Sequence, residues 1–419
     1  MKYDVVIIGA GASGLTAAYR LAFKNPQLNI LVIEKEEIAG RKLSASGNGK
    51  CNLTNAVYNE DCYHATSSHL TDSWMGHHTY QDVVSFFENM GILLYEKNGY
   101  YYPISNQAKQ VAVALCEKSQ ALGVQFAFRT RVTSVMQSQQ QNATYVVCAT
   151  NIDGYNVEYC TDYVLLATGG VAASKLGGCD YGYTIAKKLG LKVNPVYPVL
   201  SPIYVDDKNL RIAKGVRIDG AITLKLKEGR IIRESGQIQI NQNSLSGIVM
   251  MNMSCFVNQR RCETVESLYI DTCPDLSWEQ LKQFFLRQVK LFDGQSIVQV
   301  LNGLFPASFT AYILKRLKIE KGVLVSDVTD KQWNRLTSLI KKMEFQPQYV
   351  EDFEKAQVTG GGISLDEMHL NRFECKQYPH LYIVGEVLDV HGKCGGYNLT
   401  FAILSAIDVA DNICKKIQS

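Results

Sequence analysis

Four residues near the amino terminus have the types and spacing needed to bind a dinucleotide. Gly9, Gly11 and Gly14 form the pattern Gly-x-Gly-x-x-Gly, and Glu34 follows the last of them by twenty residues. The first glycine permits a tight turn, the second lets a pyrophosphate approach the backbone, and the third lets a helix pack closely. The carboxylate can accept hydrogen bonds from an adenosine ribose, and its charge would repel a 2′-phosphate. The pattern therefore favours FAD or NAD over NADP.

These residues require a strand, a helix and a second strand around them, and the sequence predicts all three. Residues 3–8 are a β-branched run, typical of a strand buried on both faces. Residues 15–23 are rich in Ala and Leu and predict a helix, and residues 29–33 predict the second strand. The free N–H groups and positive end of the helix would face the phosphates. A glycine-rich turn without a ligand is the weaker alternative, because both strands and the acid are in register.

A long polar segment after the second strand decides between the two dinucleotides. It contains Gly40, Arg41 and Lys42, followed by a glycine- and asparagine-rich stretch at 46–55. A plain NAD domain would continue with another βα unit. A polar loop of this kind can instead wrap an extended ligand, with the two cations near phosphate charge and the Asn side chains at ring N–H and C=O groups. A solvated surface loop is the alternative.

The residues of this segment carry a family resemblance. Gly-Arg-Lys at 40–42, followed by Ser-Gly-Asn-Gly-Lys-Cys-Asn-Leu-Thr-Asn at 46–55, resembles the YhiN/BaiN-type (HI0933-like) flavoproteins, a bacterial family of NAD(P)/FAD-dependent oxidoreductases. The family usually has Arg where Lys50 stands. The resemblance covers nearly the whole chain and is strongest at its ends. It implies FAD as the cofactor and an α/β fold, with a Rossmann-like FAD-binding domain of the two-dinucleotide-binding-motif type.

A second glycine-rich turn lies near the carboxyl terminus. Residues 381–384 predict a strand that ends on Gly385 and Glu386, and the glycines at the start of 395–399 precede a helix. The resemblance implies that the first pair contacts the ribityl or phosphate region and that 395–399 packs against the flavin ring. A helix N-terminus at the flavin N1/C2=O edge would raise its reduction potential.

Two further segments complete the expected cofactor site. The strand 162–168 closes on two glycines, as beside the FAD domain of related flavoproteins, and the strand around Val132 sits where related folds present backbone to adenine. No metal site is expected. The full set of expected cofactor contacts is Gly9, Gly11, Ala12, Ser13, Gly14, Glu34, Lys35, Gly40, Arg41, Lys42, Ser46, Gly47, Asn48, Gly49, Cys51, Asn52, Val132, Thr168, Gly169, Gly385, Glu386, Gly395, Gly396, Tyr397, Asn398 and Leu399.

No catalytic residue follows from the sequence, and the candidates are His391, Cys51, Lys50 and Tyr397. The first stands where the family commonly has Asp-Gly-x-Thr before its Gly-Gly-Tyr-Asn, so it is either a proton donor near the flavin or a solvated loop histidine, which we favour. The cysteine is either a thiolate near the flavin or a packed loop thiol. The histidine of the family's Phe-Thr-His motif is replaced in this chain by Gln242, which weakens any transfer of substrate chemistry to this position. The chain has no redox Cys pair and no second dinucleotide unit, which disfavours disulfide reduction and a separate NADPH domain.

The remaining patterns predict a discontinuous domain organisation. An FAD-binding domain at 1–192 and 356–419 should hold an inserted domain at 193–355, with a β-barrel at about 193–272 and a helical part at about 273–345. Within the first domain we expect helices at about 79–90 and 107–122, a hairpin at Asn98-Gly99 and a β meander over 124–166. A second hairpin is expected at 227–230.

The overall composition excludes several classes of protein. The chain has 419 residues, with 43 Lys and Arg against 40 Asp and Glu, and the net charge of +3 is too small to indicate nucleic acid or an anionic membrane surface. No apolar run reaches the length of about 18 residues that a membrane span needs. The twelve cysteines have no zinc spacing, so we interpret them as buried thiols in a reducing cytoplasm.

We therefore expect an FAD-dependent oxidoreductase that transfers hydride between bound flavin and an unidentified small organic substrate, with NAD(P)H as a possible transient reductant. One alternative is a flavin-dependent RNA-modifying protein, for which the basic residues at 211–233 would form the contact surface. Intervening acids favour a solvated β ribbon there. The other alternative is a flavin-binding sensor without turnover. The substrate and the oligomeric state stay open.

Overall fold

The computed structural model describes residues 2–67, 74–138, 143–259, 263–292 and 294–418. The chain divides into two compact units, the first formed by Met1–Tyr197 with Ala356–Ser419 and the second by Pro198–Lys355. The first boundary lies five residues beyond position 192, where the sequence analysis placed it. The reason is that strand β11 (Val193–Val199) begins in the first unit and pairs with β19 (Val358–Ile363).

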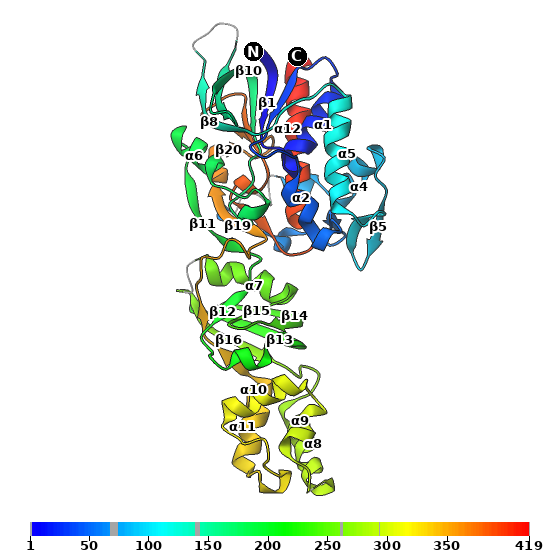
Figure 1. Ribbon diagram of the computed structural model, residues 1–419, viewed down its shortest axis with the longest axis vertical. Coiled ribbons are helices and arrows are strands. Elements are labelled where there is room, and N and C mark those ends of the chain that lie inside the picture. Colours follow the sequence, from blue (N-terminus) through cyan, green and yellow to red (C-terminus); the bar gives the residue numbers. More distant parts are fainter. Residues whose placement is uncertain (1, 68–73, 139–142, 260–262, 293, 419) are drawn as a thin grey trace. The chain divides into compact units, whose positions relative to one another are not determined.

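A mixed sheet with a parallel middle forms the centre of the first unit, as in a Rossmann-like domain (Figure 1). The pairings from β22 through β10, β1 and β2 to β7 are all parallel. Residues 5–8 of β1 are fully buried, as their unbroken apolar run predicts. In spatial order the strands are β20 (Met368–His369), β21 (Glu374–Cys375), β22 (Leu381–Ile383), β10 (Asn156–Leu166), β1 (Lys2–Ile8), β2 (Ile30–Ile33) and β7 (Gln125–Ala127).

Helices α1 (Ala12–Lys24) and α12 (Tyr397–Gln418), from opposite ends of the chain, lie side by side (Figure 1). Arg20 donates two hydrogen bonds of 2.7 and 3.0 Å to Asp411, and Lys24 lies 3.0 Å from the same carboxylate. The predicted helices at 79–90 and 107–122 are confirmed. The other α-helices among the described residues of this unit are α2 (Arg41–Ala45), α4 (Tyr80–Asn89), α5 (Ala108–Ala121) and α6 (Tyr181–Lys188).

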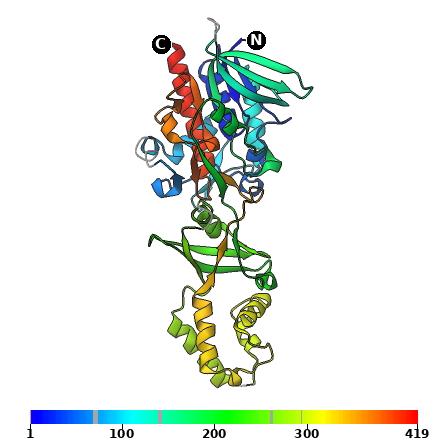
Figure 2. The same cartoon turned by 90° about the vertical axis from the view of Figure 1, so that its left-hand side faces the viewer.

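Antiparallel strands complete the first unit. The predicted meander is confirmed for β8 (Thr130–Gln137), β9 (Tyr145–Asn151) and β10, and its third strand also belongs to the central sheet (Figure 2). The predicted hairpin turn has φ values of 56° at Asn98 and 86° at Gly99, as a two-residue turn of this kind requires. It joins β5 (Leu94–Lys97) to β6 (Tyr100–Pro103), which pairs with β3 (Thr54–Asn55); β4 (Tyr63–Ala65) pairs with β23 (Val390–Gly392).

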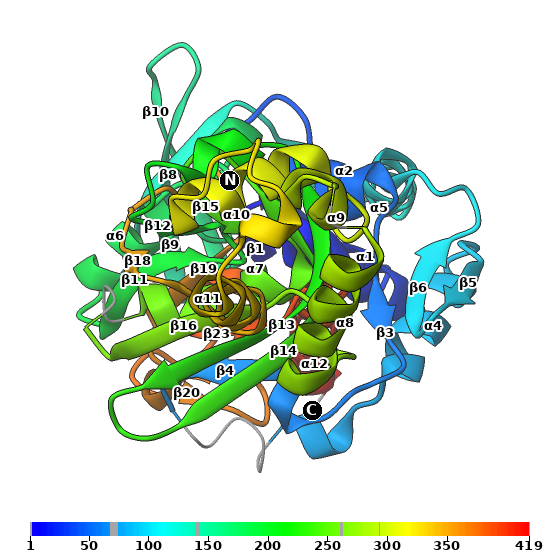
Figure 3. The ribbon, with the colours of Figure 1, turned by 90° about the horizontal axis from the view of Figure 1, so that it is seen from below.

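The second unit is built on a seven-stranded antiparallel sheet, in which β13 and β14 form a long pair (Figure 3). The two edge strands are separated in the chain only by Gln346, so the two edges of the sheet come close together at this point, but they do not pair with each other among the described residues, and the barrel stays a prediction. The predicted hairpin at 227–230 is confirmed. In spatial order the strands are β17 (Met343–Phe345), β16 (Val265–Asp271), β13 (Arg217–Leu226), β14 (Ile231–Ile240), β15 (Ser244–Ser246), β12 (Ile203–Val205) and β18 (Pro347–Gln348).

Helix α7 (Ile248–Asn258) corrects the prediction of strands throughout 193–272. Its sequence is so uniformly apolar that periodicity alone cannot separate a buried helix from a buried strand. The predicted helical part is confirmed, and Ser277 and Thr329 both form capping boxes with the glutamine three residues on. Its helices are α8 (Trp278–Leu291), α9 (Ile297–Asn302), α10 (Ala307–Leu317) and α11 (Asp330–Lys341).

Candidate functional site

The three glycines of the first turn meet different surroundings. A Cβ on Gly9 would lie 2.5 Å from the carbonyl oxygen of Ala167, and a Cβ on Gly14 would lie 1.9 Å from the carbonyl oxygen of Gly9. These two glycines are therefore required by the packing of the protein itself. A Cβ on Gly11 would meet no atom within 4 Å. Gly11 thus faces open space, which is what a residue that receives a pyrophosphate against its backbone needs.

Helix α1 begins at this turn and directs its first N–H groups there. Gly11 is its N-cap, and no side chain of the described residues caps it. The first turn of such a helix has unpaired N–H donors and a partial positive charge, both of which favour a phosphate. A Cβ on Gly385 would lie 2.7 Å from the hydroxyl oxygen of Ser13. The second glycine-rich segment therefore reaches the same helix end, as the sequence predicts.

Glu34, which directly follows β2, fixes the backbone of the glycine turn by a hydrogen bond. One carboxylate oxygen accepts a hydrogen bond of 2.7 Å from the Ala10 amide, and the other accepts one of 2.9 Å from the Glu36 amide. An ionised carboxylate offers about four lone-pair sites, so these two bonds leave capacity for a ribose hydroxyl. The residue is therefore suited both to fixing the glycine turn and to the ribose contact that its position predicts.

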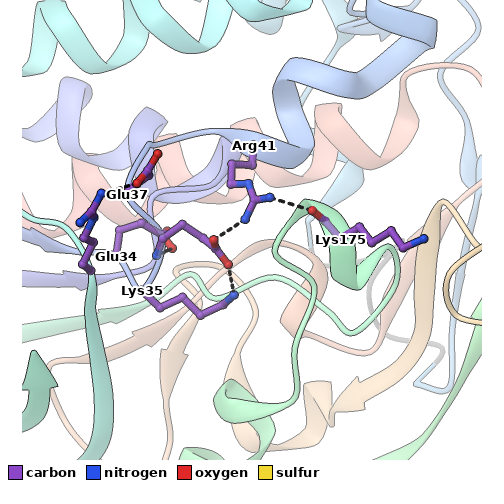
Figure 4. Close-up of polar contacts among 7 residues, drawn as sticks. Glu34, Lys35, Glu37, Arg41 and Lys175 are labelled. Atoms are coloured by element: carbon purple, nitrogen blue, oxygen red, sulfur yellow. Dashed lines mark hydrogen bonds and ion pairs between the residues drawn. The ribbon is translucent and has the colours of Figure 1, made fainter. Parts of the chain in front are cut away.

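Each of the two cations expected near phosphate charge is paired with a carboxylate in the structure. Arg41 forms an ion pair with Glu36 and donates a hydrogen bond of 2.8 Å to the carbonyl oxygen of Lys175 (Figure 4). Lys42 donates hydrogen bonds of 2.9 and 2.7 Å to the two carboxylate oxygens of Glu386. The sequence did not reveal these partners. Lys175 and Glu386 lie far along the chain, and Glu36 is a nearby carboxylate that competes with a phosphate for the charge of Arg41.

A groove of about 840 Å³ opens beyond Glu34. It lies where the adenosine end of an extended dinucleotide would continue from the ribose-binding acid. Val132, the expected adenine neighbour, is buried and lies opposite Ala149 in β9, beside the groove residue Arg131. The groove is lined by Lys35, Glu36, Glu37, Ile38, Arg41, Arg129, Arg131, Thr150, Asn151 and Ile152.

The glycine turn before α12 packs directly on the segment that follows α2. A Cβ on Gly396 would lie 2.9 Å from the Thr54 amide nitrogen. The Asn55 amide donates a hydrogen bond of 3.3 Å to the carbonyl oxygen of Gly395, and the Thr400 hydroxyl lies 2.9 Å from that of Thr54. Two segments about 340 residues apart therefore meet in one unit, which is necessary if both are to contact the same ligand.

The expected polar loop is more ordered than the sequence indicates. Residues 41–45 form α2 and residues 46–49 form a short 3₁₀ segment, in which Gly47 and Asn48 have left-handed backbone. Lys50 is exposed. Cys51 is fully buried, and burial raises the pKa of its thiol to about 11. Both observations favour the packed-thiol interpretation of Cys51 over a thiolate near the flavin.

Tyr397 and Asn398, at the start of α12, both form hydrogen bonds within the first unit. The Asn398 amide accepts a hydrogen bond of 2.8 Å from the Gly392 N–H and donates one of 3.0 Å to the Gly392 carbonyl oxygen. Tyr397 is buried, and its carbonyl oxygen accepts a hydrogen bond of 2.9 Å from the Tyr63 hydroxyl. Both ends of the Asn398 side-chain amide therefore hold the backbone of Gly392, and the expected flavin contact of Asn398 stays a prediction.

His391 is not a solvated loop residue, which corrects the interpretation favoured from the sequence. It lies in β23, opposite His64 of β4, and only 3% of its surface is exposed. Its Nε2 lies 3.2 Å from the hydroxyl oxygen of Tyr197. Burial, helped by the neighbouring His64, lowers the pKa of His391 to about 3. The imidazole is therefore neutral near pH 7. Neither Tyr197 nor His64 stands in a motif that could have revealed this cluster.

The burial of His391 predicts a pH-dependent stability. Below about pH 6.5 the unfolded chain takes up a proton at this side chain that the native chain does not, so the free energy of unfolding falls as the pH falls towards 3. The contribution is at most about 1.4 kcal/mol per pH unit. Urea unfolding of wild type and His391→Asn at pH 8, 6 and 5 measures it. The stability advantage of the wild type should shrink with acidity. An advantage that stays constant over this range would contradict the prediction.

Several buried polar atoms fit a bound FAD. Among the described residues, three such atoms have no hydrogen-bond partner: the hydroxyls of Thr168 and Tyr183 and the side-chain amide oxygen (Oδ1) of Asn52. Unpaired buried polar atoms are rare in native proteins, and ordered water or a ligand usually satisfies them. A Cβ on Gly169 would meet nothing within 4 Å, so space also adjoins Thr168. Two of these residues, Thr168 and Asn52, are expected cofactor contacts, whereas Tyr183 is an addition from the structure.

A family model described as the HI0933-like protein Rossmann domain matches residues 3–412. The chain belongs to the HI0933-like family. This membership confirms the resemblance of the 40–55 segment, the Rossmann-like fold and the class of FAD-dependent oxidoreductases. In the described residues, no helix combines the length and apolar character needed to cross a membrane, and no three His, Cys, Asp or Glu side chains form a metal-binding group.

Relatives of the chain match it over almost its full length. The 3-dehydro-bile acid delta(4,6)-reductase of Clostridium scindens is 30% identical over 397 residues, covering 94% of this chain and 95% of that protein. The ribosomal RNA dihydrouridine synthase of Escherichia coli K12 is 28% identical over 422 residues, covering 98% of each. A variant of the FrdA chain of E. coli quinol fumarate reductase has a similar fold, with a TM-score of 0.51 at 14% identity, covering 100% of this chain and 71% of that one.

Proposed function

We propose that this HI0933-like protein uses bound FAD to reduce a carbon–carbon double bond conjugated to a carbonyl group in a small organic substrate. NAD(P)H would serve as the transient reductant. The observation that carries the flavin assignment is the meeting of the two glycine turns, where Gly396 packs on Thr54 and Asn55 bonds to Gly395. The open face of Gly11 at the end of α1 adds the place for a pyrophosphate.

The class of double bond follows from what two relatives are named for. A delta(4,6)-reductase of a 3-dehydro bile acid is named for carbon–carbon double bonds at positions 4 and 6 of a steroid whose C3 carries a carbonyl group, so that these bonds are conjugated to it. A dihydrouridine synthase saturates the C5=C6 bond of uracil, which is conjugated to the C4 carbonyl. Both reactions add a hydride to one carbon of a polarised double bond and a proton to the other. This chemistry is the shared element that we transfer to the present chain.

The chain would contribute binding and orientation to this reaction. When bound, FAD supplies the hydride chemistry. The first turn of α1 is placed to hold the pyrophosphate, and Glu34 is placed to hold the ribose while it braces the Ala10 amide. Glu386 is held by Lys42 and by the Thr359 amide at 2.9 Å, so its carboxylate is oriented before any ligand arrives.

Ribosomal RNA is the second candidate substrate, because the relative with that specificity matches 98% of the chain. The basic residues of the β13–β14 region would be the contact surface, but they are interleaved with acids. Lys225 pairs with Glu266 at 2.7 Å, and Asp219 and Glu228 are both exposed. The mixed charge of this ribbon favours the small substrate over a polyanion.

An absorbance spectrum followed by anaerobic reduction tests the proposal. The purified protein should show a bound flavin spectrum that bleaches with NADH or NADPH. The reduced protein should then be reoxidised by 2-cyclohexenone or a 3-oxo-Δ4 steroid, with a product that gains two hydrogen atoms. Unmodified ribosomal RNA is tested in parallel, and reoxidation by RNA alone would favour the second candidate. A protein that takes up no FAD, or whose reduced flavin none of these acceptors reoxidises, would refute the proposal.

A further inference from the structure

A buried imidazole nitrogen in the first unit has no assigned role. The Nδ1 atom of His391 is buried and has no hydrogen-bond partner among the described residues. The other ring nitrogen is engaged, because Nε2 lies 3.2 Å from the Tyr197 hydroxyl. Leaving a buried polar atom unpaired is costly, so a native protein usually provides a partner for it. The partner of Nδ1 is therefore expected to come from outside the chain.

The imidazole is held in place from several sides. The β23–β4 pairing sets His391 opposite His64, whose ring centroid is 5.3 Å away. On the following residue, Gly392, the Asn398 amide makes two hydrogen bonds to the backbone. Two residues before it, the Asp389 carboxylate accepts a hydrogen bond of 2.7 Å from Asn194. The side chain is thus preorganised, which is a property of groups that stabilise charge during a reaction.

The contact with Tyr197 decides which nitrogen carries the proton. A neutral imidazole has one donor and one acceptor nitrogen. We take Tyr197 as the donor to Nε2, because a phenol hydroxyl donates readily to an imidazole lone pair. The proton of the ring consequently lies on Nδ1, the buried atom without a partner. Among the described residues, the titratable side chains in contact with His391 are Tyr197 and His64, and a positive charge on His64 would further disfavour a charged His391.

The site of this donor adjoins the glycine turn. His391 precedes Gly395 by four residues, and Gly392 packs against Tyr397 at the start of α12, where a Cβ would lie 2.6 Å from the Tyr397 Cβ. The same turn bonds to Asn55 and packs on Thr54. His391 therefore belongs to the part of the unit where the flavin ring would lie under the proposed function.

We propose that His391 is a neutral hydrogen-bond donor whose Nδ1–H binds an oxyanion formed during the reaction, with Tyr197 as the positioning residue. This inference rests on the proposed function. The oxyanion has two possible sources with the same chemistry, namely the substrate carbonyl oxygen and the C2 carbonyl oxygen of reduced flavin. In the first case, a hydride adds to the β-carbon, the π electrons move onto the substrate oxygen, and a proton from solvent then adds to the α-carbon and restores the carbonyl. The substrate gains a hydride and a proton, and the reduced flavin returns to the oxidised form.

Two amide substitutions at one position separate the roles of the two nitrogens. An asparagine side chain places its amide near the position of Nδ1, whereas a glutamine side chain places its amide near Nε2. His391→Asn therefore keeps the proposed donor, and His391→Gln keeps only the contact with Tyr197. We expect the rate of flavin reoxidation by 2-cyclohexenone to fall about 100- to 1,000-fold in His391→Gln. We expect it to stay within about tenfold of wild type in His391→Asn.

The reduction potential of the bound flavin distinguishes the two sources. If the oxyanion belongs to the flavin, the potential falls in His391→Gln by about 30 mV for each tenfold loss of affinity for the reduced form. If it belongs to the substrate, the potential is unchanged, and reoxidation by 2-cyclohexenone slows while reoxidation by ferricyanide does not. Either pattern supports the proposal. A fully flavinated His391→Gln protein with wild-type potential and wild-type reoxidation would overturn it and leave the proposed function standing.

A measurement on the wild-type chain avoids any loss of folding in the variants. Selective ¹⁵N labelling of histidine reports which ring nitrogen is protonated. We expect His391 to be neutral with the proton on Nδ1 from pH 5 to 9, and we expect Tyr197→Phe to mix the two tautomers. An imidazolium, or a proton on Nε2, at pH 7 in the wild type would overturn the proposal. Failure of the protein to bind FAD would instead refute the proposed function.

Discussion

A Gly11→Val variant is expected to fold like the wild type and to lose about 100-fold in FAD affinity, or roughly 2.8 kcal/mol. A Cβ at Gly11 would meet no protein atom within 4 Å, and the backbone there has φ −81° and ψ −168°, which any residue adopts. The valine methyl groups would instead fill the space in front of the α1 N-terminus, where the pyrophosphate is expected. Thermal unfolding of the apoprotein and titration with FAD measure the two effects separately.

Two other glycines provide controls for this variant. Gly322 in the second unit also meets nothing within 4 Å, so Gly322→Val should leave both stability and FAD affinity unchanged. Gly14→Ala should destabilise the apoprotein itself, because its Cβ would lie 1.9 Å from the carbonyl oxygen of Gly9. Wild-type FAD affinity in Gly11→Val would show that the cofactor does not approach this turn.

A Gly396→Ala variant is expected to lose both stability and flavin. The φ of Gly396 is +95°, and the new Cβ would lie 2.9–3.0 Å from three backbone atoms of Thr54. Neither segment can yield by rotating a side chain, because backbone meets backbone. The sum of backbone strain and overpacking is roughly 2–5 kcal/mol. Chemical denaturation of the apoprotein gives the first effect, and the flavin content of the purified protein gives the second.

The matched control for this variant is Gly123→Ala. Gly123 has nearly the same backbone, with φ +93°, but a Cβ there would meet nothing within 4 Å. Gly123→Ala should therefore cost only the strain of the left-handed backbone, roughly 1–2 kcal/mol, and retain FAD. Equal losses of stability in the two variants, with flavin retained in both, would mean that the contact between the α12 turn and Thr54 has no part in the site.

The sequence alone was sufficient for those parts of the protein that depend on local spacing. The turn at Gly9, Gly11 and Gly14, the acid at Glu34 and the strand–helix–strand order around them are all determined by residues within one short segment. The hairpin at Asn98-Gly99 is another case, since both residues tolerate the positive φ that the turn requires. Such features need no knowledge of distant neighbours.

Helix α7 and the charged pairs show where local information ends. An apolar run such as 248–258 suits a buried helix and a buried strand equally well, and only the surrounding sheet decides between them. Likewise, the positive charges of Arg41 and Lys42 suit a phosphate, but a nearby carboxylate satisfies them as well. For Lys42 the partner carboxylate is Glu386, which lies 344 residues away in the chain.

The sequence by itself determined the dinucleotide-binding turn, the family and the division of the chain into a discontinuous domain with an insertion. Only the tertiary structure decided the state of His391, because burial and the contact with Tyr197, 194 residues away, turn an expected loop histidine into a buried neutral imidazole. The tertiary structure also decided that the Cys51 thiol is buried and that the Asn398 side chain forms hydrogen bonds to the backbone of Gly392. The physical reason is the same in each case: solvation and hydrogen bonding depend on which distant segments exclude water from a side chain.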